Sequence, residues 1–160
     1  DYFPLYVGNH ILGGGGLVSR LFREVREERG LSYSVNSRFS PMAQDGPYTF
    51  SLQTRNDQTG EALEVLRATL KEFHDKGPTE EELVAAKKNI TGGFPLRIDS
   101  NSKIVEYLAM IGFYDLPLDY LETFNERVMA VTHEQIRDAY RRRVPLARMA
   151  TVIVGGEASP

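Results

Sequence analysis

Arg26 and Tyr33 are two hydrogen-bond-donating side chains that the local sequence pattern brings together. Arg26 lies in the last turn of a predicted helix, and Tyr33 opens the predicted strand that follows, seven residues later. Gly30 between them has the position of a helix C-terminal cap, so the chain can turn there and let the guanidinium and the phenol converge. Taken singly, Arg26 would be a surface ion-pair partner on a glutamate-rich helix, and Tyr33 would be a core residue. The convergence of the two side chains is therefore the feature to test.

Histidine is the first residue type to consider for a metal site or for acid–base catalysis, and the chain has three: His10, His74 and His133. None has a partner at metal-ligand spacing. His133 opens the stretch HEQIR, in which Arg137 occupies the place of the second histidine of the zincin motif H-E-x-x-H. Because a catalytic zinc usually has about three protein ligands, we expect no metal site built from this chain alone. His74 and His133 are expected to lie at the surface.

Four consecutive glycines interrupt the apolar pattern near the N-terminus: Gly13, Gly14, Gly15 and Gly16. They lack the G-x-x-x-x-G-K-[ST] spacing of a phosphate-binding loop and do not follow a predicted strand. Because glycine destabilises a helix interior, we expect the tetrad to end the first helix. It could let another backbone approach closely or let the preceding helix move, and it could equally be a break without function.

The remaining polar clusters have structural interpretations. Ser32 and Ser34 flank Tyr33, but no nucleophilic triad can be assembled from the scattered histidines. The acidic run 80–82 suits a helix N-terminus and the arginine run 141–143 suits a helix C-terminus, because these charges complement the helix dipole.

The elements around Arg26 and Tyr33 follow from periodicity. Apolar residues recur at helical spacing from Leu17 to Val25, which predicts a helix over about 17–29. After Gly30 the pattern changes to period two and predicts a strand over 32–40, with Tyr33 and Val35 on one face. The turn residues 45–47 then separate it from a second alternating run, 48–53, so we expect an antiparallel pair.

The rest of the chain is predominantly helical. Helices are predicted over about 2–12, 58–76, 79–90, 101–113, 118–128 and 132–143, with capping boxes beginning at Thr79 and Thr132. The run MATVIV at 149–154 predicts a central strand. The sum is an α+β fold: a two-layer α/β sandwich with helices covering one face of a mainly antiparallel sheet.

Composition limits the possible classes of protein. The chain has 160 residues and a net charge of −3 with both signs interspersed, which argues against nucleic acid or an anionic membrane as a partner. There is no cysteine, and no apolar run approaches the roughly 18 residues of a membrane span. We expect one domain over 1–160. Since the chain begins at Asp1 within an apolar pattern, we expect it to be part of a longer chain, without its first strand or strands.

Several stretches together resemble the pitrilysin/insulinase family of inverzincin metallopeptidases, which includes the mitochondrial processing peptidases. They are ILGGGG-x-x-SRLF-x-x-x-R-x-x-x-GLSYSV, DGPYTF, GPTEEEL-x-x-AKK and VTHEQI, and they span nearly the whole chain. In that family two homologous domains enclose a peptide, and one of them holds zinc through H-x-x-E-H. This chain lacks that motif, so it resembles the second, zinc-free domain, with the processing-peptidase-like fold.

The resemblance implies roles for particular residues. The family's R-x₆-Y motif, which reaches the substrate at the zinc, falls on Arg26 and Tyr33, and the glycine tetrad is similar in position to a substrate-contacting loop, although the longer loop is absent. Tyr33 would then donate a hydrogen bond to the developing oxyanion and Arg26 would position the peptide, while a partner domain supplies zinc, water and the general base. The chain alone would not be catalytic.

The resemblance leaves other properties open. An alternative is a non-catalytic scaffold domain, like the respiratory-complex core subunits of the same fold. The zinc domain could be fused or a separate subunit, and the isolated domain could form a homodimer. The compartment is undecided, with the family favouring the bacterial periplasm over the cytoplasm.

Overall fold

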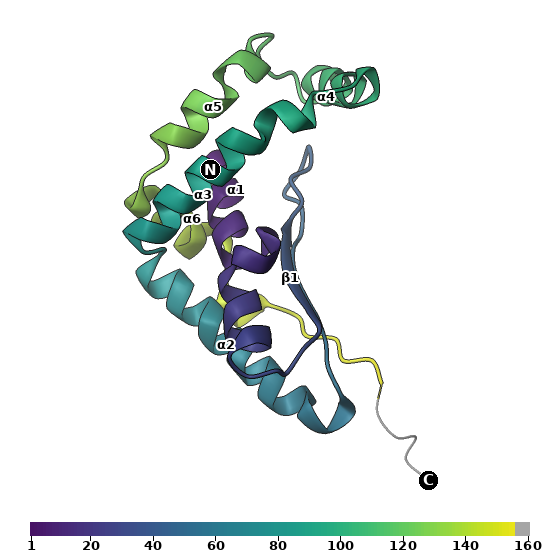
Figure 1. The fold of residues 1–160 in the computed structure, drawn as a ribbon, viewed down its shortest axis with the longest axis vertical. Helices are drawn as coiled ribbons and strands as arrows, with labels where there is room; N and C mark the ends of the chain where they lie inside the picture. Colours follow the sequence, from purple (N-terminus) through teal and green to yellow (C-terminus); the bar gives the residue numbers. More distant parts are fainter. Residues whose placement is uncertain (156–160) are drawn as a thin grey trace.

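The computed structural model describes residues 1–155 of the chain. Its helices form a curved layer, and a β-hairpin lies along the concave side of that layer (Figure 1). The α-helices are α1 (Tyr2–Asn9), α2 (Thr59–Lys76), α3 (Glu80–Gly93), α4 (Asn101–Phe113), α5 (Tyr120–Ala130) and α6 (His133–Arg143). π-Helical segments are η1 (His10–Gly14) and η3 (Phe22–Glu27), and 3₁₀ segments are η2 (Gly16–Val18), η4 (Asn56–Gln58), η5 (Phe94–Arg97) and η6 (Leu146–Arg148). None of the described helices has the length and apolar character needed to cross a membrane.

The sheet consists of β1 (Ser34–Phe39) and β2 (Tyr48–Gln53), which pair antiparallel. Val35 pairs with Leu52 and Ser37 pairs with Phe50. Strand β1 packs against α1, η1 and η3, so the segment that carries Arg26 lies directly against the strand that follows Tyr33. The α+β class and the antiparallel pair are confirmed.

The strand predicted over 149–154 is wrong. These residues are not in a strand, and Val152 and Val154 are exposed to solvent. Thr151 accepts a hydrogen bond from Arg67 Nη2 to its Oγ1 at 2.9 Å. A β-branched run indicates that a segment suits a buried strand, but it forms one only where another strand lies beside it. Within residues 1–155 the sheet contains only β1 and β2.

The two N-terminal helices differ from the prediction around the glycine tetrad. The first helix does not end before the glycines but continues as η1 to Gly14. The second helix does not include Leu17 and Val18, which lie in the 3₁₀ turn η2 with 70% and 72% of their surface exposed. Gly16 causes this break because it has a φ of 64°, a left-handed conformation that favours glycine.

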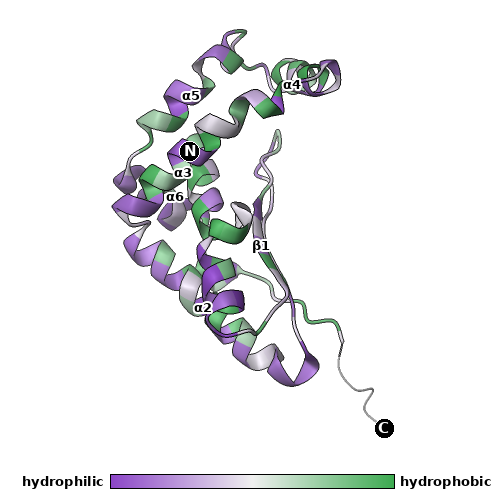
Figure 2. Cartoon of the chain, viewed as in Figure 1, coloured by the Kyte–Doolittle hydropathy of each residue, from purple (hydrophilic) through white to green (hydrophobic). Residues whose placement is uncertain are grey.

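The core lies between α1, α2, α5 and α6. Phe73 and Tyr140 are completely buried, and their rings meet edge to face with centroids 4.8 Å apart. Gly8 permits this packing, because a Cβ there would come within 2.5 Å of the Tyr140 ring. Hydrophilic residues predominate along the outer side of α2, α3 and α6 (Figure 2).

Both predicted capping boxes are confirmed. Thr79 accepts from the backbone of Glu82, whose carboxylate accepts from the backbone of Thr79, and Thr132 and Gln135 repeat this arrangement at α6. Each box satisfies amide groups that have no partner within the helix. At α3 the same glutamate also binds an arginine from the helix of the candidate site.

Candidate functional site

The turn between η3 and β1 brings Arg26 and Tyr33 together. Gly30 has a φ of 62°, and its amide donates to the carbonyl of Arg26 at 3.0 Å. The amide of Leu31 donates to the carbonyl of Val25 at 2.9 Å, so the chain leaves the helix by a short capped turn. The predicted position of Gly30 as the cap is confirmed.

The guanidinium of Arg26 contacts two aromatic rings. Its Cζ lies 4.8 Å from the centroid of the Tyr33 ring and 4.7 Å from that of Phe22. These distances are those of cation–π contacts. Phe22 is buried and Tyr33 is exposed, so the buried ring orients a cation that in turn contacts the exposed tyrosine. The predicted convergence of Arg26 with Tyr33 is confirmed.

Arg26 is distinguished from the other arginines of its helix by its lack of a carboxylate partner. Arg20 pairs with Glu82, Arg23 with Glu24, and Arg29 with Glu24 at 3.0 Å. Among the contacts of residues 1–155, Arg26 makes no ion pair, although acidic residues surround it in sequence. The interpretation of Arg26 as an ordinary surface ion-pair partner therefore does not describe this structure.

Tyr33 is not the core residue that its position in a period-two pattern suggests. Of its surface 82% is exposed, because β1 begins one residue later, at Ser34. The backbone before it is held by Ser32, whose hydroxyl donates to the carbonyl of Gln53 at 2.6 Å, and by Thr54, whose hydroxyl donates to the carbonyl of Leu31 at 2.6 Å. Tyr33 is thus an exposed phenol on a fixed backbone.

A shallow hollow of about 520 Å³ lies beside Tyr33. Its other walls come from the end of β2 and from η4, including Gln53, Arg55 and Gln58. Amide and guanidinium groups there can bind the polar groups of an extended peptide. Gln53, Arg55 and Gln58 were not predicted as site residues, and neither were Thr54 and Phe22. The first four meet the Tyr33 segment only where the end of β2 lies beside it, which local patterns do not show. Phe22 lies four residues before Arg26 in the same helical segment, so helical spacing was the signal that could have indicated their contact.

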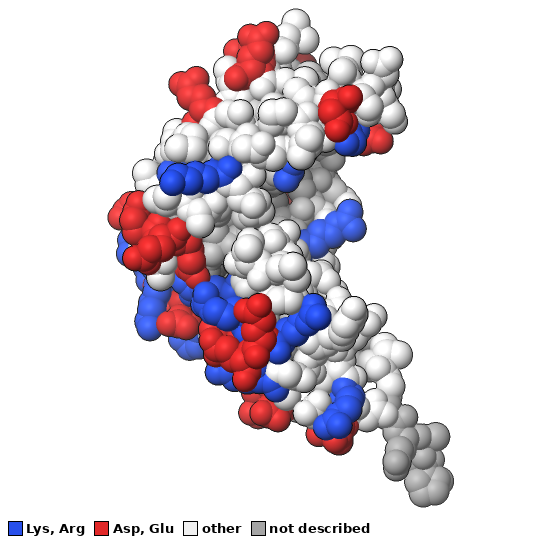
Figure 3. All heavy atoms as spheres, viewed as in Figure 1, with Lys and Arg blue, Asp and Glu red and all other residues white. Residues whose placement is uncertain are grey.

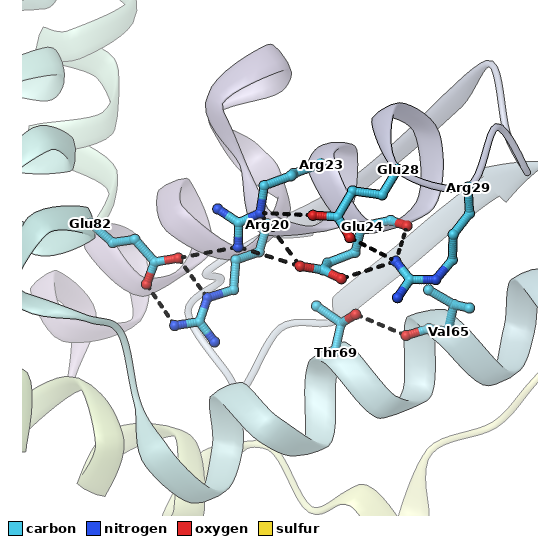
Figure 4. Close-up of polar contacts among 8 residues, drawn as sticks. All are labelled: Arg20, Arg23, Glu24, Glu28, Arg29, Val65, Thr69 and Glu82. Carbon is cyan, nitrogen blue, oxygen red and sulfur yellow. Dashed lines mark hydrogen bonds and ion pairs between the residues drawn. The ribbon is translucent and has the colours of Figure 1, made fainter.

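An ion-pair network fixes the helix that carries Arg26 (Figure 4). The Arg20 guanidinium donates to both oxygens of Glu82, from Nε at 2.7 Å and from Nη2 at 2.6 Å, and its Nη2 also donates to the carbonyl of Gly77 at 3.2 Å. Burial raises the pKa of the Glu82 carboxyl, but hydrogen bonds from Arg20 and from the Thr79 backbone outweigh burial and hold the pKa below its ordinary value. The pair joins the site helix to the start of α3.

Glu82→Gln is expected to lower the free energy of unfolding by about 2–3 kcal/mol at pH 7, because it leaves the buried Arg20 without its carboxylate. Since the folded pKa of Glu82 lies below its unfolded value, the pair stabilises fully above about pH 4.3. This stabilisation is lost as the pH falls through the folded pKa. Urea unfolding at pH 7 and pH 3 measures both effects. Glu81→Gln is the matched control in the same helical turn and should lose at most about 1 kcal/mol; equal losses would contradict the role of the Arg20 pair.

The four glycines have different structural roles. A Cβ at Gly13 would lie 2.5 Å from the backbone nitrogen of Ser37 in β1, and one at Gly15 would lie 2.5 Å from the carbonyl oxygen of His10. A Cβ at Gly14 would collide with the Asn9 side chain, whereas at Gly16 nothing lies within 4 Å. The close approach of another backbone, one of the two roles expected for the tetrad, is therefore observed at Gly13. A contact between the tetrad and substrate stays a prediction.

The histidines do not form a metal site in the part of the chain that the structure describes. No three His, Cys, Asp or Glu side chains of residues 1–155 are arranged to hold a metal ion. His133 is a first-turn residue of α6 that packs against Gly77, and His74 is partly buried beside Asp75, with Nδ1 3.1 Å from Oδ1. The described residues thus do not fit a zinc site.

The arginine run at the end of α6 is structural, as expected. Arg142 and Arg143 both pair with Asp1, at 2.8 and 2.9 Å, and Arg141 donates to the backbone carbonyl of Asp75. The Asp1 pairs hold the start of α1 against the end of α6, and the Arg141 contact holds the end of α2 against it.

Comparison with known proteins gives the family. The family model described as the peptidase M16 inactive domain matches residues 1–90 of this chain. The crystal structure of a peptidase M16 inactive domain from Pseudomonas fluorescens has a TM-score of 0.85 and 41% identity, covering 91% of this chain and 35% of that chain. A Helicobacter pylori relative named non-peptidase homolog YmxG is 30% identical, and the match covers 90% of this chain and 33% of that protein. An uncharacterized zinc protease YmxG from Bacillus subtilis is 37% identical over 64% of this chain and 25% of that protein.

This chain belongs to the peptidase M16 inactive-domain family. The resemblance to the pitrilysin/insulinase metallopeptidases is confirmed. The chain spans about a third or less of the length of these two curated relatives.

Proposed function

We propose that this chain is the zinc-free half of an M16 peptidase, which binds a peptide and places Arg26 and Tyr33 beside a zinc site on another domain. The observation that carries the proposal is the Arg26–Tyr33 contact: an exposed phenol held by an arginine that has no carboxylate partner among residues 1–155. A domain with an H-x-x-E-H motif, fused or separate, would supply the zinc and the general base. The same surface could also pair two copies of the isolated domain.

In this proposal Tyr33 donates a hydrogen bond from its hydroxyl to the scissile carbonyl oxygen as that oxygen gains negative charge. Such a donor stabilises a transition state best when it is fixed in advance, and the Ser32 and Thr54 hydrogen bonds fix the backbone directly before Tyr33. Arg26 has free N–H groups that can bind a peptide carbonyl, because a cation–π contact uses the face of the guanidinium and leaves its edge open.

Two further features support a peptide-binding surface. The π-helical segment η1 leads into the turn at Gly16, and the π-helical segment η3 contains Arg26. Such segments are frequent at functional sites. Gly13–Gly16 lead into the exposed side chains of Leu17 and Val18, which offer apolar surface to a peptide. We therefore include the glycine turn in the proposed substrate-binding surface.

A scaffold function is the second candidate, and the name of the Helicobacter pylori relative, non-peptidase homolog, favours it. Such a domain would use the same face to bind a partner subunit without contributing to hydrolysis. It would place no requirement on the Tyr33 hydroxyl.

Co-purification with the H-x-x-E-H domain of the same organism separates the two functions. We expect the chain alone to hydrolyse no peptide and the complex to hydrolyse a fluorogenic peptide library much faster than the H-x-x-E-H domain alone. Hydrolysis is measured by fluorescence, and complex formation by size-exclusion chromatography. A stable complex that adds no activity would contradict the catalytic proposal and favour the scaffold.

A further inference from the structure

A groove of about 500 Å³ shares no lining residue with the hollow beside Tyr33. Its walls come from α1, η5, α4 and α5, and we call it the aromatic groove; six of its lining residues are Tyr2, Tyr6, Arg97, Tyr107, Tyr120 and Phe124. Figure 1 shows α4 and α5 together at one end of the curved layer and the start of β1 toward the other. The groove is therefore separate from the Arg26–Tyr33 pair.

The apolar part of the aromatic groove is fixed by ring packing. Tyr2 and Tyr6 stack with centroids 5.8 Å apart and planes 13° from parallel, and Tyr6 meets Phe124 edge to face at 5.9 Å. Phe124 and Tyr120 are buried, so they cannot rotate away without disturbing the core. A groove with rigid aromatic walls suits a flat or branched apolar group.

The polar part contains one arginine whose charge is not matched by an acid. Arg97 Nη1 donates to the Tyr6 hydroxyl at 2.5 Å, and within residues 1–155 no carboxylate lies within ion-pair distance of Arg97. The other lining cation, Lys103, is already paired with Asp99 at 2.8 Å. A guanidinium carries five N–H donors in a plane, so Arg97 retains donors for a carboxylate ligand.

The phenols beside Arg97 are hydrogen-bond donors at neutral pH. Burial raises the pKa of Tyr2, of Tyr6 and of Tyr120 above the ordinary value. Neutral phenols can donate to an anion without repelling it. Glu106 also lines the groove, and its negative charge disfavours every anion, one with several negative charges most strongly.

We propose that the aromatic groove binds the carboxyl-terminal residue of a peptide, with an apolar side chain between the rings and the terminal carboxylate on Arg97. The groove volume lies within the usual range for ligand pockets, and it leaves room for the residue before the terminal one. Leu96 and Met110 extend the apolar lining of the groove and would contact that penultimate residue. The proposal shares with the proposed function only its peptide ligand and does not require the zinc-bearing domain.

Isothermal titration of the full chain with Ala-Ala-Phe, with its carboxamide and with 3-phenylpropanoate tests this proposal. We expect the free acid to bind at least tenfold more tightly than the amide. Arg97→Gln should reduce the affinity for the acid to that for the amide, whereas Arg148→Gln, the same change outside the groove, should alter it less than twofold. Equal binding of acid and amide, or an unaffected Arg97→Gln variant, would overturn the carboxylate site.

The third ligand identifies the source of the carboxylate. If 3-phenylpropanoate binds as tightly as the tripeptide, the peptide assignment is wrong, because the groove then recognises only a carboxylate with an apolar group. Ring resonances of the tyrosines, followed by NMR, report on occupancy of the groove and on folding of each variant. Because these measurements use no peptidase activity, failure of this proposal leaves the proposed role of Tyr33 intact, and the reverse also holds.

Discussion

Tyr33→Phe is expected to lower the kcat of the assembled peptidase by about 10²- to 10³-fold, the usual effect of removing one donor to a developing oxyanion. The substitution removes only the hydroxyl and keeps the ring against the Arg26 guanidinium. Since 82% of the tyrosine surface is exposed, the free energy of unfolding should change by less than about 0.5 kcal/mol. Steady-state hydrolysis of a fluorogenic peptide, together with urea unfolding of the chain, measures both quantities.

Tyr114→Phe is the matched control for this prediction. Tyr114 is also exposed, and its hydroxyl donates to the Pro41 carbonyl at 3.3 Å, away from the candidate site. Its loss should leave kcat within twofold of the wild type. A Tyr33→Phe enzyme as active as the Tyr114→Phe enzyme would exclude a catalytic phenol and would favour the scaffold function.

Local sequence signals were sufficient to predict the elements that carry the site. Gly30 marks a helix end, and the change from helical to period-two spacing after it marks β1, so the approach of Arg26 to Tyr33 follows from residues that are close in sequence. The capping boxes at Thr79 and Thr132 are equally local. Each of these features depends on hydrogen bonds within one or two turns of the chain.

The errors concern features that depend on distant partners. The period-two pattern places Tyr33 with Val35, but the contacts of Ser32 and Thr54 with the opposite segment fix where β1 begins, and Tyr33 remains outside it. The error at Leu17 is local instead: Leu17 continues a helical row in sequence, yet the left-handed conformation of the adjacent Gly16 turns it into solvent. Periodicity shows which residues could be buried together and cannot show whether a neighbouring element is present to bury them.

The second ring of the site, Phe22, was missed although its contact with Arg26 is local, because residues four apart on a helix lie side by side. Its apolar spacing makes Phe22 an ordinary core residue, but in the structure its ring centroid lies 4.7 Å from Arg26 Cζ. Arg26 has no carboxylate partner among residues 1–155. With Phe22 buried and Tyr33 exposed, the guanidinium is oriented by the core and at the same time accessible to a ligand. This arrangement makes the geometry of Arg26, and not only its charge, the property to test.

Arg26→Ala is expected to lower kcat/KM of the assembled peptidase by about 10- to 100-fold, because a peptide that is misplaced by about 1 Å reacts that much more slowly. Arg26→Lys should recover little of this loss, since lysine keeps the charge but lacks the planar group that lies against two rings. The two cation–π contacts together contribute about 1–2 kcal/mol to stability, so both variants should remain folded. Peptide hydrolysis and urea unfolding of each variant test these expectations.

Arg29→Ala separates a specific role of Arg26 from a general effect on its helix. Arg29 lies three residues after Arg26, in the turn that follows η3, and its Nη1 pairs with Glu24 at 3.0 Å. Loss of this exposed ion pair changes the free energy of unfolding by at most about 1 kcal/mol. We expect the Arg29→Ala enzyme to retain wild-type kcat/KM. If it loses as much activity as Arg26→Ala, the effect comes from the charge or stability of the helix, and the positioning role of Arg26 is wrong. If Arg26→Lys is fully active, charge alone suffices and the contacts of the guanidinium with Phe22 and Tyr33 have no part in catalysis.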